Sequence, residues 1–181
     1  NSLAAKYSPV FRSRGGSVVL ENRTVLPKAW LVSDLRVISS SLERLDFISD
    51  GSFVPSVTAV VESSPPFALQ AGNRMPAVEI TTYSPNLIRM TAVPDRGSLL
   101  VLGEKLYNWW YVTVDGKPAE IVPVNHILRG VYLTPGKHTV EFRFDPLPFK
   151  IGKWLTLGSF ALFALVAVRE WLIRRRRSDA P

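Results

Sequence analysis

The strongest constraint on this chain is an apolar segment near its C-terminus. Residues 154–168 are 15 uncharged, mostly apolar residues, and they lack the polar face that an interfacial helix needs. A helix of that length spans about 22 Å, whereas a bilayer core is about 30 Å thick. Lys150, Lys153 and Arg169 flank the run, and long basic side chains extend from the bilayer edge to its surface. We therefore predict one transmembrane helix in the segment 149–173.

The residues around this helix predict its orientation. Trp154 and Trp171 suit the two membrane interfaces, where tryptophan is enriched. Four arginines follow the helix, at positions Arg174, Arg175, Arg176 and Arg177. Because basic residues favour the cytoplasmic side, we expect residues 174–181 to be a cytoplasmic tail and residues 1–148 to lie outside.

The net charge of +7 invites a nucleic-acid interpretation, but its distribution argues against one. Residues 1–148 carry 15 Lys and Arg against 13 Asp and Glu, whereas residues 149–181 carry seven against two. The basic charge therefore belongs to the membrane segment and its tail. We expect the lipid bilayer to be a partner, and we expect no nucleic acid.

A domain outside the membrane needs an export signal. The first residues, NSLAAKYSPVFRSRGG, contain no apolar core of a signal peptide. We expect upstream transmembrane helices of the same protein to have exported the domain. Residues 1–16 are then a lead-in or linker, and residues 17–148 are an extracytoplasmic domain.

The pattern of residues 17–148 favours strands. The predicted strands are 17–20, 29–32, 55–62, 78–84, 87–92, 98–103, 110–114, 119–124, 131–133 and 138–144. Turn signals predict hairpins between strands 78–84 and 87–92, between 110–114 and 119–124, and between 131–133 and 138–144, and strands 17–20 and 29–32 are predicted to pair. Helical spacing predicts one short helix near residues 39–48, capped by Ser39 to Ser41 and ended by Asp50-Gly51. The predicted fold class is mainly β, an antiparallel β-sandwich or jelly-roll-like domain followed by one C-terminal transmembrane helix.

The two histidines lie close together in the chain. In the strand HTVEFRF, alternation places His138 with Val140 and Phe142 on a core face, and Glu141 on a solvated face. We predict a hydrogen-bonded histidine at the rim of the core; a ligand or general base is the alternative. His126 lies in the loop 125–130, where Gly130 is expected to allow a positive φ.

Four residues are candidates for contact with a glycan or an anion. His126 and Arg129 could bind an anionic group such as phosphate. Trp109 and Tyr111 alternate with Trp110, which we assign to the core, and so could face a sugar ring, the membrane or another domain.

Other chemistry is sparse. The chain has no cysteine, no glycine-rich phosphate loop, no His/Glu spacing typical of a metal site and no G-x-S-x-G motif. Glu79, Asp95 and Glu104 supply carboxylates, but the sequence does not place two of them at a glycosidase separation. We therefore predict no catalytic residue, no metal site and no cofactor in this chain.

A family resemblance rests mainly on residues 107–152. The matching positions, in order, are Tyr107 and Trp110, Val114-Asp115-Gly116-Lys117-Pro118, Asn125, Arg129-Gly130-Val131-Tyr132, Pro135-Gly136-Lys137-His138-Thr139-Val140-Glu141-Phe142, Pro146, Phe149 and Gly152. Earlier elements are Leu26-Pro27-Lys28-Ala29-Trp30 and the run ITTYSPNLIRM at 80–90. This pattern resembles the C-terminal region of YfhO-like bacterial membrane proteins, over roughly residues 17–168. The family usually has Pro-Gly where this chain has Asn108-Trp109.

The resemblance implies a polytopic protein of the bacterial cytoplasmic membrane, similar to GT-C glycosyltransferases. Such proteins transfer sugars from polyprenyl-phosphate donors to envelope polymers, and their catalytic acidic loops lie near the N-terminus. No residue here matches those loops, so the implied role is that of an accessory domain beside envelope polysaccharide or polyprenyl-linked sugar. A glycan-binding module without a catalytic parent and a structural anchor remain the alternatives.

Overall fold

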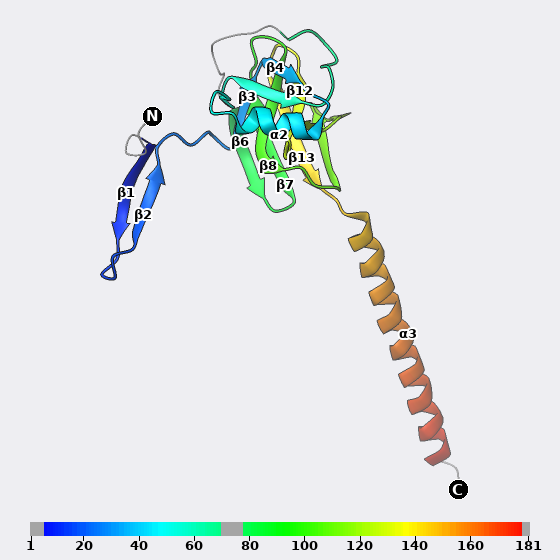
Figure 1. The fold of residues 1–181 in the computed structure, drawn as a ribbon. Helices are drawn as coiled ribbons and strands as arrows, with labels where there is room; N and C mark the ends of the chain where they lie inside the picture. Colours follow the sequence, from blue (N-terminus) through cyan, green and yellow to red (C-terminus); the bar gives the residue numbers. More distant parts are fainter. Residues whose placement is uncertain (1–5, 70–77, 179–181) are drawn as a thin grey trace. The chain divides into compact units, whose positions relative to one another are not determined.

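The computed structural model describes residues 6–69 and 78–178 (Figure 1). Its strands are β1 (Tyr7–Arg12), β2 (Val18–Asn22), β3 (Ala29–Val32), β4 (Asp34–Val37), β5 (Thr58–Val61), β6 (Val78–Ser84), β7 (Leu87–Ala92), β8 (Ser98–Lys105), β9 (Trp110–Val114), β10 (Lys117–Ala119), β11 (Val122–Val124), β12 (Leu128–Leu133) and β13 (His138–Phe144). Its helices are α2 (Ser41–Ser49) and α3 (Leu147–Ser178).

Two sheets make up the β-rich body. One has five strands in the order β10-β9-β13-β7-β6, and the other has six in the order β3-β8-β12-β11-β5-β4. Pairs such as β13–β7 and β12–β8 are antiparallel, while β4 and β5 run parallel. The predicted fold class, a mainly β sandwich followed by a C-terminal helix, is confirmed.

The two sheets meet through β12 and β13. Arg129 on β12 lies over the ring of Phe142 on β13, with its guanidinium carbon 5.5 Å from the ring centroid. Strand alternation and pairing add further buried side chains to the two facing surfaces: Leu100, Leu102, Val131 and Leu133 from one sheet, and Ile88, Met90 and Val140 from the other. The predicted core face of the strand HTVEFRF is therefore correct.

The opposite face of the six-stranded sheet is also covered. Its buried cluster consists of Trp30, Val32, Ala59, Val61, Leu99, Val101, Val122 and Val124. The indole Nε1 of Trp30 donates a hydrogen bond to the carbonyl oxygen of Pro55, 2.9 Å away, in the segment that follows α2. Because both of its faces are covered, β8 is buried from Ser98 to Leu102, as its continuous apolar sequence predicts.

Helix α2 confirms the predicted short helix and its caps. Ser40 is the N-cap, with its side chain accepting from the Glu43 N–H, and Asp50 ends the helix. The apolar spacing does not define a buried face, because Leu42 and Leu45 are exposed. The buried side chain is Arg44, which donates to the carbonyl oxygens of residues 38 and 39 and pairs with Glu62.

Two of the predicted hairpins are confirmed. β6 pairs with β7, and β9 pairs with β10. Between the latter two strands, Asp115 and Gly116 both have positive φ, 52° and 77°, as the Asp-Gly turn predicts.

Two predicted pairings and one predicted strand are wrong. β12 and β13 do not form a hairpin around Pro135-Gly136, because β12 lies in the six-stranded sheet and β13 in the five-stranded sheet. The strand predicted at 119–124 is two strands, β10 and β11, also in different sheets. β2 pairs with β1 rather than β3, so the segment 1–16 contains a strand that its sequence did not predict.

Helix α3 covers the predicted membrane segment 149–173. It is the one helix among the described residues that is long and apolar enough to cross a membrane, over Leu147–Arg175. None of the side chains in its apolar window is buried. The chain divides into two compact units, and α3 lies in the second of them, with Tyr107–Trp110.

Candidate functional site

The predicted aromatic platform has an irregular backbone. Trp109 has a φ of 73° and accepts a hydrogen bond from the Asp145 N–H, 2.8 Å from its carbonyl oxygen. Strand alternation therefore does not extend to Trp109. Tyr111 is 54% exposed. Trp110, predicted as core, is only half-buried, with its ring centroid 5.4 Å from that of Phe144.

His126 belongs to a tight turn that is fixed to the neighbouring strand. Asn125 and His126 both have positive φ, 47° and 72°, as expected for the turn of a β-hairpin. The Asn125 side chain accepts from the Val60 N–H at 2.8 Å, and its backbone N–H donates to the Val60 carbonyl at 2.9 Å. Nδ1 of His126 is buried and has no hydrogen-bond partner among the described residues.

Arg129 does not lie at a surface anion site. Its side chain is 1% exposed and packs over Phe142 between the sheets. Burial lowers the pKa of its guanidinium, while the carboxylate of Glu104, 3.9 Å from Nη2, acts in the opposite direction. An anion in solution therefore cannot reach Arg129 in this structure, whereas His126 is partly exposed. The structure does not present the two side chains together as a surface anion site.

Glu104 is the centre of a polar cluster that the sequence did not predict. Its Oε1 lies 2.8 Å from Lys28 Nζ and 2.5 Å from the Tyr83 hydroxyl, which donates to it. Lys28 also lies over the Tyr83 ring. Since Tyr83 is on β6 and Glu104 on β8, this cluster joins the two sheets. Glu104 is thus paired with basic and phenolic groups rather than with Glu79 or Asp95.

The charges of this cluster determine the ionisation of Glu104. Burial acts to raise the pKa of the Glu104 carboxyl, but hydrogen bonds from Lys28 and Tyr83 and nearby positive charge outweigh it, so that pKa lies below its usual range. The Lys28 pKa is raised by its hydrogen bonds to Glu104 and Tyr83. The ionised carboxylate therefore stabilises the folded state.

This ionisation predicts an acid-dependent stability. We expect Glu104→Gln to lower the free energy of unfolding by about 1–3 kcal/mol at neutral pH, because it removes charge-assisted hydrogen bonds. A carboxyl with a depressed folded-state pKa stabilises above its unfolded pKa of about 4.3 and loses that contribution as pH falls through the folded value. Urea unfolding at neutral and acidic pH should show the two proteins converging below about pH 4.

The exposed Glu79→Gln is the matched control for this measurement, since Glu79 lies on the solvent face of β6. It should change stability by less than about 0.5 kcal/mol at either pH. A gap between wild type and Glu104→Gln that widens on acidification would contradict the role given to the carboxylate.

His138 is a structural residue at the rim of the core, as predicted. Its Nδ1 lies 2.7 Å from Asp115 Oδ2, and its Nε2 lies 3.0 Å from the Thr134 carbonyl oxygen. Asp115 Oδ1 also accepts from the Thr139 N–H, and these two contacts lower the pKa of the Asp115 carboxyl. Asp115, His138 and Thr134 are adjacent, as an acid, a base and a hydroxyl would be in a catalytic triad. However, His138 Nε2 lies closer to the Thr134 carbonyl oxygen than to the Thr134 hydroxyl, which is 3.3 Å away. These contacts hold the turn at Asp115-Gly116 against the turn that precedes His138.

A pocket of about 300 Å³ lies where the chain crosses from β10 to β11. Its lining residues are Ser63, Ser64, Pro66, Phe67, Ala119, Glu120, Val122, Pro123, Val131 and Tyr132. Tyr132 packs edge-to-face on Phe67, and burial raises the pKa of its phenol. The lining contains one carboxylate, Glu120, and no basic side chain, so its chemistry does not suit an anion.

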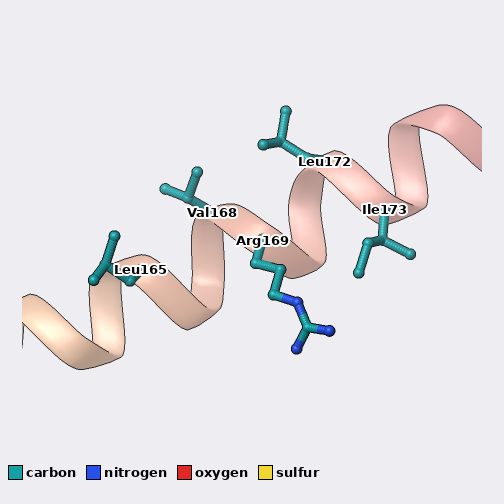
Figure 2. A pocket seen from close by; sticks show the side chains of 5 residues that line it. All are labelled: Leu165, Val168, Arg169, Leu172 and Ile173. Carbon is teal, nitrogen blue, oxygen red and sulfur yellow. The ribbon is translucent and has the colours of Figure 1, made fainter.

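A second hollow lies on α3 alone. Figure 2 shows its five side chains, Leu165, Val168, Arg169, Leu172 and Ile173, all projecting from one helix. With no second element to close it, this hollow is a groove between neighbouring side chains. The described residues contain no cluster of three or more His, Cys, Asp or Glu side chains that could hold a metal ion.

Comparisons with known proteins add no relative to this picture: no family model, curated protein or solved structure matches the chain.

Proposed function

We propose that this chain is the extracytoplasmic accessory domain and last transmembrane helix of a YfhO-like membrane protein. In this proposal the parent protein transfers sugar from a polyprenyl-phosphate donor to an envelope polymer, and its catalytic loops lie upstream. The observation that supports the membrane part of the proposal is α3, a helix of membrane-spanning length whose apolar side chains are all unburied and which runs into consecutive arginines. The family and the sugar transfer rest on the resemblance of residues 107–152 to YfhO-like proteins. A helix that is apolar all round requires lipid or other membrane helices around it.

The polar clusters of the sandwich support an accessory rather than a catalytic role. The Glu104 carboxylate is ion-paired with Lys28 and lies beside the buried Arg129. Asp115 and His138 are committed to holding two turns. A catalytic carboxylate or imidazole needs access to substrate. The hydrogen bonds of Glu104, Asp115 and His138 are instead made to other groups of this chain.

The proposal predicts an orientation that single cysteines in this chain can test within the parent protein, once any upstream cysteines are replaced, because residues 1–181 contain none. Val57→Cys places a thiol at a position that is 58% exposed on the β-rich unit, and Ala180→Cys places one in the basic tail. In intact cells a membrane-impermeant maleimide is expected to label Val57→Cys alone. Ala180→Cys should react only after the membrane is permeabilised, since basic tails stay cytoplasmic.

Three other labelling patterns are informative. Labelling of Ala180→Cys alone in intact cells would reverse the proposed topology. Labelling of both positions would mean that α3 does not span the membrane. Labelling of neither would place the β-rich unit in the cytoplasm, and each of these results would overturn the proposal.

A glycan-binding module without a catalytic parent is the second candidate. Two observations favour it: the exposed ring of Tyr111 and the pocket beside Phe67 and Tyr132, which has no basic lining. Aromatic rings with nearby polar groups are typical of small-ligand sites. This candidate differs from the first because it requires saccharide affinity in this chain alone.

A further inference from the structure

The hairpin formed by β1 and β2 leaves its large apolar side chains uncovered. These side chains are between 39% and 60% exposed and comprise Val10, Phe11, Val18, Val19 and Leu20. Such a group is unusual for a short element, because single exposed apolar residues are ordinary but contiguous ones mark an interaction surface.

The register of the hairpin places apolar side chains on both of its faces. Phe11 pairs with Val19, while Pro9 pairs with Leu20. Since Val19 and Leu20 are adjacent on one strand, their side chains project to opposite faces. Burying one face against a protein core would therefore leave the other in water. An isolated two-stranded hairpin is only marginally stable in water. Apolar contacts at a membrane interface would stabilise it, because its open-edge N–H and C=O groups could still bond to water or headgroups there.

The basic side chains of the hairpin indicate what kind of apolar surface it contacts. Arg12 and Arg14 stand at the turn end beside Phe11 and Val18, and Arg12 pairs directly with Val18. Residues 6–23 carry four basic side chains and one acidic side chain, Glu21. Apolar side chains beside arginine, with few carboxylates, suit the boundary between acyl chains and anionic headgroups.

We propose that the β1–β2 hairpin is a second membrane contact of this chain, separate from α3. Its apolar side chains enter the headgroup–acyl boundary of a bilayer, and Arg12 and Arg14 bind the phosphates of anionic lipids. Arginine donates paired hydrogen bonds to phosphate and is weakly hydrated, so it suits this position. The inference goes beyond the proposed function, since it requires a bilayer but neither a glycosyltransferase nor a particular orientation.

The test uses the full chain in lipid nanodiscs with one cysteine at a time. Val19→Cys and Val57→Cys start from valines of similar exposure, 53% and 58%, and both would carry the same environment-sensitive fluorophore. Lipids with a spin label near the headgroup quench a fluorophore at that depth. We expect several-fold stronger quenching at position 19 than at position 57. Blue-shifted emission of the same fluorophore at Leu165→Cys, in the apolar part of α3, confirms insertion, since that position lies too deep for a headgroup label to quench strongly. Phe11→Cys should give the same result as Val19→Cys.

Two further measurements examine the role of charge. Replacing anionic lipids by zwitterionic ones should reduce the quenching at position 19 several-fold. The double substitution Arg12→Glu with Arg14→Glu should reduce it similarly in anionic nanodiscs, while Leu165→Cys keeps its signal. If neither change reduces the quenching at position 19, the proposed binding of Arg12 and Arg14 to anionic lipid phosphates is wrong.

Equal, weak quenching at positions 19 and 57 would overturn the inference. A fluorophore at position 19 that is shielded from aqueous iodide but not quenched by lipid would also overturn it, because a protein would then cover the hairpin. The outcome is independent of the topology test: a hairpin in lipid with a reversed topology contradicts only the proposed function, and the correct topology with a lipid-free hairpin contradicts only this inference.

Discussion

Replacing Phe142 by alanine is expected to lower the free energy of unfolding by about 3–5 kcal/mol. The ring is fully buried between the two sheets and lies against the Arg129 guanidinium. The substitution removes a large apolar contact and leaves a cavity that rigid sheets cannot fill completely. It also takes from Arg129 the aromatic face that stabilises its buried charge. Urea unfolding in detergent, followed by tryptophan fluorescence, measures the loss.

Tyr111→Ala is the matched control, because it removes an aromatic ring that is mostly exposed. Its cost should stay below about 1 kcal/mol. The loss of stability in Trp110→Ala should lie between those of the other two variants, since Trp110 is half-buried and not, as its sequence predicted, a core residue. A Phe142→Ala protein as stable as Tyr111→Ala would mean that the two sheets do not pack through this side chain.

Gly130→Ala is expected to cost about 3 kcal/mol, although it adds only one methyl group. Gly130 lies within β12 and does not have a positive φ, so the turn role predicted for it is wrong. A Cβ at this position would lie 2.6 Å from the Leu100 carbonyl oxygen and 2.9 Å from a Val124 methyl carbon. The first contact is with the backbone of the paired strand, which cannot move without disturbing the sheet.

Gly51→Ala is the control for this substitution, because a Cβ at Gly51 would meet nothing within 4 Å. Without a clash, glycine-to-alanine replacement changes stability by less than about 1 kcal/mol. The same unfolding measurement applies to both variants. If Gly130→Ala were as stable as wild type, the close approach of β12 to β8 would be refuted, and with it the register of that strand pair.

The elements that the sequence predicted correctly are those defined by local signals. Ser40 and Asp50 bound α2 because capping depends on a few neighbouring atoms. The Asp115-Gly116 turn follows from the φ values that its two residues tolerate. The continuous apolar runs identified β8 and α3, since burial or lipid on all sides requires them.

Strand partners were not predictable in the same way, because they depend on contacts between distant residues. A Pro-Gly turn at 135–136 requires the chain to reverse but does not determine whether the flanking strands hydrogen-bond. In the structure the chain crosses there from one sheet to the other, as it does again between β10 and β11. Such crossings distinguish a sandwich from a single meander, and no short sequence window records them.

The burial of Arg129 was missed although the sequence contained a signal for it. Arg129, Val131 and Leu133 alternate on one face of β12, and the latter two are core residues. The charge directed attention to an anion site instead. What makes its burial tolerable is Glu104 on the neighbouring strand, together with the ring of Phe142, and neither proximity is visible without the pairing of the sheets.

The edges of the two sheets bear on how copies of this chain behave at high density. Confinement to a membrane plane raises the rate at which copies meet, and uncovered strand edges then invite strand addition. The edge strand β10 contains Pro118, which has no N–H to offer, beside the exposed Lys117. The opposite sheet ends in β4, where Asp34 and Arg36 project outward. Strand addition between crowded copies is therefore disfavoured at these two edges.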